Sequence, residues 1–428
     1  MRVLVTGANG FIGTRVAGAL REAGHETVAA VRAPLPAAIA NRSAVACDFA
    51  CDTDPQVWVP RLAGIDALVN CAGILRETRR ETFRNVHVDS PIALFKACAK
   101  AGVRRVVQLS ALGEPVDGEF IASKHRADQA LAALDLDWLV LRPGLVYSAH
   151  GSYGGTSLLR AIAALPGFLV VPGDGAQELR PVAAEDLAAV VVAVLAQPQR
   201  RGEIFEIVGP QIVSLRDYLL AWRAWFGLET SRVLTTPRPL VAFTVACADR
   251  FGNGPLCRVI ANLLERRRVG RADAPERMQS LLGRAPLRLA DALARRPCQA
   301  PDLLAARWYI LRYFLLCALA LLFIGSGIAG HELPLAAAQA TLPGWPPALV
   351  EVAKLFGGMA DLALGLLLLT GKARRTILAL MLVMVTGYTV VIGIGAPQHW
   401  LDPLGGLLKN LPIAALLIVL LAMEPRRR

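Results

Sequence analysis

The first half of the chain alternates short apolar runs with segments of helical periodicity. Runs of strand length lie at residues 3–5, 26–31, 43–48, 66–71, 104–109 and 204–208. Between them, apolar side chains recur at helical spacing, as in the segments 11–20 and 81–101. Strands that alternate with helices in this way predict an α/β fold, a Rossmann-like doubly wound parallel sheet.

The last part of the chain has a different pattern. Four apolar stretches lie at residues 308–329, 348–370, 375–396 and 404–423. Each holds about 20 residues, which is enough for a helix to cross ~30 Å of hydrocarbon. They predict a four-helix transmembrane bundle over residues 307–428.

An α-helical linker region is expected between the sheet domain at 1–235 and the membrane domain. Residues 239–264 are apolar but carry charges and a Gly-Asn-Gly-Pro break, which favours a helical hairpin over a membrane span. Residues 265–307 are rich in arginine, with leucines interleaved. Two interpretations of this basic segment stay open, an amphipathic surface on anionic lipid and a solvated helical cap.

The distribution of charge predicts the orientation in the membrane. The formal net charge is +12, and basic residues precede the first span, follow the second and end the chain. The loops 330–348 and 397–403 contain no Lys or Arg. The positive-inside rule therefore predicts a multi-pass protein of the cytoplasmic membrane, with the N-terminal domain and the C-terminus in the cytoplasm. Nothing resembles a nucleic-acid module, and the eight scattered cysteines suggest neither a disulfide framework nor a metal site.

Three glycines follow the first apolar run, and a helical pattern follows the glycines. Gly7 would permit a tight turn, Gly10 the close approach of a pyrophosphate, and Gly13 the packing of the helix on the strand. The helix N-terminus would supply N–H groups to the phosphates. A structural glycine turn is the alternative, but the strand–turn–helix context favours a dinucleotide site.

Two side chains at predicted strand ends bear on which dinucleotide binds. Arg32 ends the second strand, where an acid would favour the 2′-hydroxyl of NAD and an arginine favours the 2′-phosphate of NADP. We therefore expect NADP(H) to be favoured over NAD(H), unless Arg32 is only a solvated side chain. Asp48 ends the third strand and could accept a hydrogen bond from the adenine amine.

Several motifs together resemble a known family. They are Thr6-Gly7-x-x-Gly10-x-x-Gly13, Asn70-x-Ala72-Gly73, Val106 to Ser110, Lys124 and Leu141-Arg142-Pro143-Gly144. Residues 1–225 resemble an atypical or extended short-chain dehydrogenase/reductase, close to the accessory subunit of respiratory complex I and to NmrA-like proteins. The resemblance implies a cofactor site that comprises Gly7, Asn9, Gly10, Phe11, Ile12, Gly13, Arg32, Asp48, Ala72, Gly73, Lys124 and Pro143.

The resemblance also reveals a departure in the catalytic element. The family uses Tyr-x-x-x-Lys on one helix, but here Phe120 stands in the tyrosine position and only Lys124 remains. Ser110 is the other candidate catalytic residue, and His87 stands where extended members often carry Asn. The other candidate proton donors near this element are Tyr147, Tyr153, His125 and His150.

The second apolar stretch carries small and charged side chains on one helical face. They are Lys354, Gly357, Gly358, Asp361 and Gly365. Such a stripe belongs in a bundle interior. An ion pair of Asp361 with Lys354 or Lys409 is one expectation; a polar pocket for a quinone head group, or a proton path, is the other. The segments 402–405 and 408–412 resemble the DoxX-like four-helix family, some of whose relatives are linked to quinones.

Three functional hypotheses follow. The first is a membrane-tethered oxidoreductase that uses NADP(H) to reduce a lipid-soluble acceptor such as a quinone. The second is a non-catalytic, dinucleotide-binding redox sensor or assembly factor of a membrane complex. The third is an epimerase or dehydratase of nucleotide sugars, which the loss of tyrosine at Phe120 disfavours. In the first two the partners are the lipid bilayer and either a lipid-soluble molecule or a membrane complex.

Overall fold

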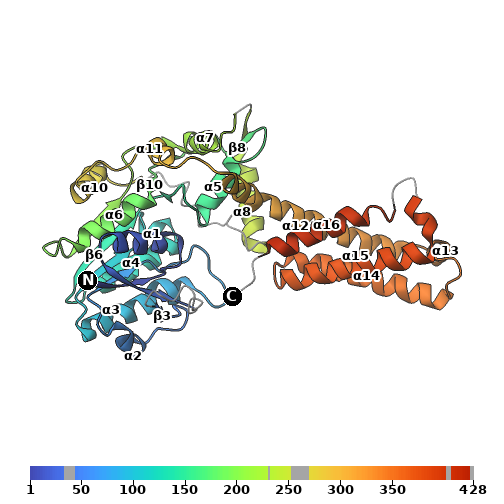
Figure 1. The fold of residues 1–428 in the computed structure, drawn as a ribbon, viewed down its shortest axis with the longest axis horizontal. Coiled ribbons are helices and arrows are strands. Elements are labelled where there is room, and N and C mark those ends of the chain that lie inside the picture. The colour runs from blue at the N-terminus through green and yellow to red at the C-terminus, as the bar shows by residue number, and fades with distance from the viewer. Residues whose placement is uncertain (33–43, 230–231, 252–268, 402–405, 425–428) are drawn as a thin grey trace. The chain divides into compact units, whose positions relative to one another are not determined.

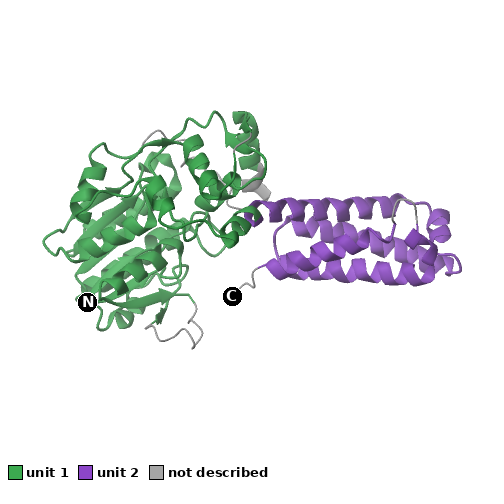
Figure 2. Ribbon diagram, turned by 45° about the horizontal axis from the view of Figure 1, so that its top comes forward, with its two compact units in different colours: residues 1–246, 255–307 green, residues 247–254, 308–428 purple. Residues whose placement is uncertain are grey.

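The computed structural model describes residues 1–32, 44–229, 232–251, 269–401 and 406–424 (Figure 1). The chain divides into two compact units, coloured separately in Figure 2. Unit 1 comprises residues 1–246 and 255–307, and unit 2 comprises residues 247–254 and 308–428. The basic run at 265–268, the arginines at 426–428 and the residues 402–405 lie outside the described residues.

Unit 1 contains a parallel sheet of seven strands. Its strand order is β11-β6-β5-β4-β1-β2-β3. The bounds are β1 Arg2–Thr6, β2 Glu26–Val31, β3 Ala44–Ala46, β4 Ala67–Asn70, β5 Arg105–Leu109, β6 Asp137–Pro143 and β11 Glu203–Ile207. The order reverses beside β1, because β2 and β3 lie on one side of it and β4 on the other. A doubly wound sheet binds its ligand at this reversal, outside the carboxyl ends of the strands. The predicted fold class is confirmed.

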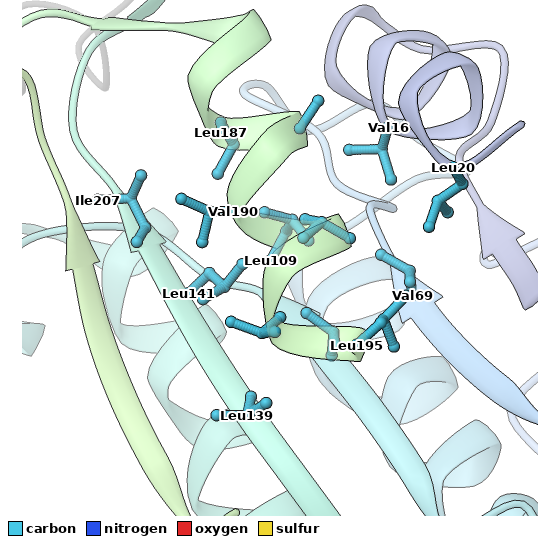
Figure 3. Close-up of a cluster of buried hydrophobic side chains, with 14 of the residues drawn as sticks. Val16, Leu20, Val69, Leu109, Leu139, Leu141, Leu187, Val190, Leu195 and Ile207 are labelled. Carbon is cyan, nitrogen blue, oxygen red and sulfur yellow. The ribbon is translucent and has the colours of Figure 1, made fainter. Parts of the chain in front are cut away.

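Helices cover both faces of the sheet because alternate strand residues point to opposite sides. Val3 and Val5 face α1 (Phe11–Glu22) and α6 (Ala184–Leu195) in one apolar core. Figure 3 shows this core, with Val16, Leu20, Leu187 and Val190 from the helices above strand residues. Leu4 faces the other side, where α3 (Ser90–Ala101) and α4 (Glu119–Ala132) pack in a second core.

Smaller elements of unit 1 build a third core beside the sheet. It collects apolar side chains from α5, α7 and α11, among them Leu159, Trp222 and Leu293. Ser214 caps α7, since its Oγ accepts a hydrogen bond of 3.0 Å from the Asp217 N–H. The bounds of the elements of the third core and of the other elements not yet named are α2 Pro55–Trp58, β7 Val146–Tyr147, α5 Gly155–Ala163, β8 Leu169–Pro172, β9 Glu178–Leu179, β10 Val182–Ala183, β12 Val213–Ser214, α7 Leu215–Trp225, β13 Val233–Thr236, α8 Arg238–Phe251 and α11 Leu289–Ala294.

Three leucines of the basic segment, Leu281, Leu289 and Leu293, are buried in protein. This burial disfavours the lipid-facing surface, which was one of the two interpretations left open for the segment. Leu281 of α10 (Ala274–Leu282) joins the core above the sheet. Leu289 and Leu293 join the third core. The buried Asp186 carboxylate fastens this segment, since it accepts hydrogen bonds of 2.6 Å from both the Arg284 guanidinium and the Leu287 N–H. Asp186 stands in the first turn of α6.

Unit 2 is helical, and among the residues that the structure describes three helices are long and apolar enough to cross a membrane. These are α12 (Ala300–Glu332), α14 (Pro347–Leu369) and α15 (Arg374–Gly395). The fourth predicted span is shorter, because α16 covers only Asn410–Met423. Its 14 residues extend about 21 Å, less than the ~30 Å of a bilayer core. The short α13 is Leu335–Thr341.

Small residues bring α12 and α14 into close contact. A Cβ added at Gly327 would lie 2.7 Å from the carbonyl oxygen of Gly358, and one at Gly365 would lie 2.9 Å from that of Ala320. The predicted interior stripe therefore faces a neighbouring helix. The expected ion pair of Asp361 is absent from the described residues. Its carboxylate instead accepts a 2.8 Å hydrogen bond from Ser326 of α12, a short polar side chain that already faces it.

Candidate cofactor and active site

The turn between β1 and α1 can be built only from small residues. Gly7 has a φ of +61°, a conformation that side chains with a Cβ rarely adopt. A Cβ at Gly13 would lie 2.1 Å from the Gly7 carbonyl oxygen, so the helix could not approach the strand. Gly10 precedes α1 as its N-cap, and no side chain caps the first N–H groups of the helix. Those donors therefore stay available to an anion at the helix N-terminus.

A cavity of about 860 Å³ opens above this turn and runs along the carboxyl ends of the strands. Ser110 and all of the predicted cofactor residues except Asp48 line it: Gly7, Asn9, Gly10, Phe11, Ile12, Gly13, Arg32, Ala72, Gly73, Lys124 and Pro143. The volume lies within the range of ligand sites, and the glycine cradle with its free helix N-terminus suits a pyrophosphate.

Polar side chains join the ends of the central strands beneath the cavity. Thr6 Oγ1 donates to Asn70 Oδ1 at 2.5 Å, and Asn70 Nδ2 donates to Gln108 Oε1 at 2.7 Å. The same Asn70 oxygen accepts from the Ala72 N–H at 3.2 Å. β1, β4 and β5 are thus held in register where the chain turns into Ala72 and Gly73.

Lys124 extends from α4 into the cavity wall. Its ammonium group donates to the carbonyl oxygens of Ala72 and Leu109, at 2.8 and 3.2 Å. Burial lowers the pKa of Lys124 to about 8, although the nearby Asp128 and Cys71 side chains raise it. Gly73 provides the room, since a Cβ there would lie 2.9 Å from the Lys124 nitrogen.

His87 is buried beside Lys124 and is held as a neutral side chain. It lies in a π-helical stretch, Arg84–Asp89, which opens the predicted helix before α3. His87 Nε2 accepts from the Ile74 N–H at 3.0 Å, so Nδ1 carries the proton and donates to Ser123 Oγ at 2.9 Å. Burial, and then the charge of Lys124, lowers the pKa of His87 well below its usual value.

Phe120 forms an apolar wall where the family has its phenol. Its ring lies edge-on to His87 and Phe83, with centroid distances of 5.6 and 6.0 Å. It lines the cavity and has no group that exchanges a proton.

The Ser110 hydroxyl is engaged away from the other candidates. It donates to Asp128 Oδ2 at 2.7 Å, and the same oxygen accepts from the Arg142 guanidinium at 3.0 Å. Burial raises the pKa of Asp128, while Ser110 and Arg142 lower it. Ser110 therefore reaches the cavity as part of a buried polar cluster.

Of the four alternative proton donors, only Tyr153 lines the cavity. Tyr147 is buried against Tyr218, in the third core. His125 Nε2 lies 3.3 Å from the Ala111 carbonyl oxygen, and His150 pairs with Glu185 at 3.3 Å.

The end of the cavity near β2 and β3 contains charges that sequence reasoning missed. Glu81 Oε1 lies 2.5 Å from Arg32 Nη1 and lines the cavity with it. Asp48 pairs with Arg80 at 2.5 Å and does not line the cavity, although its neighbours Cys47 and Phe49 do. No local signal links residues that lie 49 and 32 positions apart.

Comparison with known proteins identifies the family. A model of the NAD dependent epimerase/dehydratase family matches residues 3–208. A 3-diazoavenalumate denitrifying reductase from a Streptomyces species is 30% identical over 225 residues, which cover 46% of this chain and 72% of the relative. The chain belongs to the NAD-dependent epimerase/dehydratase family. The resemblance to short-chain dehydrogenases/reductases is thereby confirmed.

Two further proteins, one compared by sequence and one by structure, are similar to this chain. The photosystem II assembly factor Ycf39 of a Synechocystis species is 29% identical over 156 residues, which cover 36% of this chain and 48% of the relative. The UDP-N-acetylglucosamine 4-epimerase of Bacillus cereus has a similar fold, with a TM-score of 0.52 and 16% identity over 72% of this chain and 99% of that one.

The C-terminal part has its own family. A DoxX-like family model matches residues 313–418, which confirms the second resemblance. The chain therefore joins an NAD-binding Rossmann domain of the epimerase/dehydratase family to a DoxX-like membrane domain. The motif at 402–405 that first suggested DoxX lies outside the described residues.

Proposed function

We propose that this protein is a membrane-tethered, NAD(P)H-dependent oxidoreductase that reduces a lipid-soluble acceptor of the quinone class. The observation that carries the proposal is the cavity wall at Lys124, where a buried ammonium group remains and Phe120 replaces the phenol. The similarity to a reductase supports hydride chemistry on this fold, and the apolar helices support a location in a membrane.

The residues of the cavity would have distinct roles. Gly7, Gly10 and Gly13 would hold the pyrophosphate, and Lys124 a hydroxyl of the adjoining ribose. The bound dinucleotide would supply a hydride. Reduction of a quinone by this hydride also requires one proton at a quinone oxygen. This proton need not come from a precisely positioned phenol, and the Lys124 ammonium group can donate it. Phe120 would provide an apolar surface for the ring.

Arg32 supports a preference for NADP(H). It lines the cavity at the tip of β2, where a guanidinium can bind a 2′-phosphate. We also propose the orientation that the basic flanks favour, with unit 1 and the C-terminus in the cytoplasm.

Steady-state oxidation of NADPH by the full-length protein in detergent tests the proposal. The assay offers quinones of increasing tail length together with simple ketones and aldehydes. We expect turnover with quinones and little with the carbonyl compounds. Gly10→Asp is the control, because a carboxylate at the N-terminus of α1 repels the pyrophosphate. Cofactor binding without turnover on any acceptor would overturn the proposal.

A second candidate function is a non-catalytic redox sensor or assembly factor. The similarity to an assembly factor favours it, as does the engagement of the Ser110 hydroxyl by Asp128. This function predicts that purified protein never turns over, and that Gly10→Asp removes partners from a pull-down. Partners that still co-purify with Gly10→Asp would exclude cofactor sensing.

A further inference from the structure

The turn at residues 78–81 carries two neighbouring charges to the end of the cavity near β2 and β3. Arg80 pairs with Asp48 and Glu81 pairs with Arg32, each at 2.5 Å. The turn is fixed by its own hydrogen bonds, since the Thr78 N–H donates to the Glu81 carbonyl oxygen at 2.8 Å and Thr78 Oγ1 accepts from the Glu81 N–H at 2.9 Å. Arg32 and Asp48, the two side chains that sequence analysis placed beside the adenosine, therefore each have a partner from the same turn.

Glu81 differs from Arg80 in that it faces the cavity. Glu81 and Arg32 both line it, whereas Arg80 and Asp48 do not. The Glu81 side chain is 24% exposed and that of Arg32 is 67% exposed, so the protein confines the carboxylate more than the guanidinium. Tyr153 lines the cavity too, and burial and the charge of Glu81 raise the pKa of its phenol, while Arg32 lowers it.

The pair presents opposite charges to one ligand position. The ribose 2′ position carries a hydroxyl in NAD(H) and a phosphate in NADP(H). A carboxylate accepts a hydrogen bond from the hydroxyl and repels the phosphate, while a guanidinium binds the phosphate. Because Glu81 occupies one nitrogen of the Arg32 fork, a 2′-phosphate would have to share or displace it.

We propose that Glu81 is the specificity-determining residue at the ribose 2′ position, where it accepts the hydroxyl of NAD(H) and weakens, without abolishing, the binding of the NADP(H) phosphate by Arg32. The inference rests on the proposed dinucleotide site, but not on the identity of the acceptor. The opposed charges allow both dinucleotides to bind, with a modest ratio of affinities.

Direct binding tests the assignment on the full-length protein in detergent. Titration with NADPH and with NADH, followed by nicotinamide fluorescence, gives the two dissociation constants. We expect Glu81→Gln to tighten NADPH binding about 5–10-fold and to weaken NADH binding about 2–5-fold, in keeping with partly exposed charge pairs. In an Arg32→Ala background the gain in NADPH binding should fall to about twofold, because the two residues act together.

Glu178→Gln is the matched control. Glu178 also lines the cavity, on β9, and its substitution removes the same charge. The ratio of the two dissociation constants should stay at its wild-type value in this variant. An equal change in Glu178→Gln, or an unchanged ratio in Glu81→Gln, would overturn the proposal.

The outcomes separate this assignment from the proposed function. Binding that responds to Glu81→Gln as described, without oxidation by any quinone, would exclude the quinone reductase and leave the assignment intact. Quinone turnover together with an unchanged ratio of the NADPH and NADH dissociation constants in Glu81→Gln would exclude the assignment of Glu81 and leave the quinone reductase intact. A protein that binds neither dinucleotide would contradict both.

Discussion

The ammonium group of Lys124 is surrounded by carbonyl oxygens, while the nearby acid Asp128 is held by Ser110 and Arg142. Burial therefore dominates, and it lowers the pKa of Lys124 to about 8. A lysine with this pKa can give up a proton close to neutral pH, which is the task left vacant at Phe120. The histidine beside it stays neutral, because burial and Lys124 lower its pKa.

The pH dependence of turnover follows from this environment. Since the protonated form donates, the rate of a proton-limited step should be constant below about pH 8 and fall about tenfold per unit above it. His87 should add no break between pH 6 and 8, because its pKa lies well below 6.5. Rates measured from pH 6 to 10 check this, with Lys124→Met as the comparison. A rate that rises through pH 8 would contradict a donor role for Lys124.

Phe120→Tyr should restore the lost phenol. Position 120 lines the cavity on the helix that carries Lys124, so a hydroxyl there would meet a buried ammonium group. We expect the variant to gain reduction of small ketones, a reaction that needs a positioned acid, by about 100-fold or more. NADPH oxidation with ketones measures it. Wild-type protein that already reduces ketones as fast as quinones would contradict the role given to Phe120.

Elements with strong local patterns could be predicted from the sequence. The β2 strand matches its predicted bounds, and the glycine turn lies where β1 meets α1, because apolar runs and glycine spacing are local signals. The pairing of Arg32 with Glu81 was not predicted, because the two residues lie 49 positions apart. The π-helical stretch around His87 was not predicted either, because apolar periodicity does not distinguish it from an α-helix. For Leu281 and Leu293 a lipid-facing surface and a solvated cap both stayed open, because periodicity reveals an apolar face but not its partner; both residues are buried in protein cores.

The glycine turn between β1 and α1, together with the helix that follows it, offers a matched pair of glycine substitutions. Gly13→Ala would place a Cβ 2.1 Å from the Gly7 carbonyl oxygen, so α1 must move away from the turn. We expect at least a tenfold loss of dinucleotide affinity and about 1–3 kcal/mol of destabilisation. Gly18 lies on the same helix with nothing within 4 Å of an added Cβ, so Gly18→Ala should retain binding. Titration with NADPH and thermal unfolding compare the two; equal affinities would contradict a tight cradle.

The contact of α12 with α14 offers a similar test. Gly327→Ala would bring a Cβ within 2.7 Å of the Gly358 carbonyl oxygen, whereas Gly325 has nothing within 4 Å. Gly327→Ala should separate the helices and lower thermal stability in detergent by about 1–3 kcal/mol, and Gly325→Ala should not. Thermal unfolding of the two variants, monitored by tryptophan fluorescence, measures this difference in stability. Equal melting temperatures would contradict this helix contact.

At the scale of the whole molecule, the chain joins two families that could each be recognised from motifs. The epimerase/dehydratase model ends at residue 208 and the DoxX-like model begins at 313. The described residues between them were harder to predict, because periodicity does not show that Leu281, Leu289 and Leu293 are buried within unit 1. In the membrane domain, the fourth apolar stretch forms a helix of only 14 residues. The pairing of an NAD-binding domain with apolar helices is what directs the proposal to a lipid-soluble acceptor.

A single-turnover experiment tests the central claim most directly. Full-length protein in liposomes is loaded with NADPH, mixed with a quinone, and followed by nicotinamide absorbance. Loading with cofactor deuterated at the transferred position then reports on hydride transfer itself. The account predicts decay of the absorbance with each quinone that partitions into the bilayer, slowed by deuterium and abolished by Gly10→Asp. Bound cofactor whose absorbance persists with every quinone would contradict it.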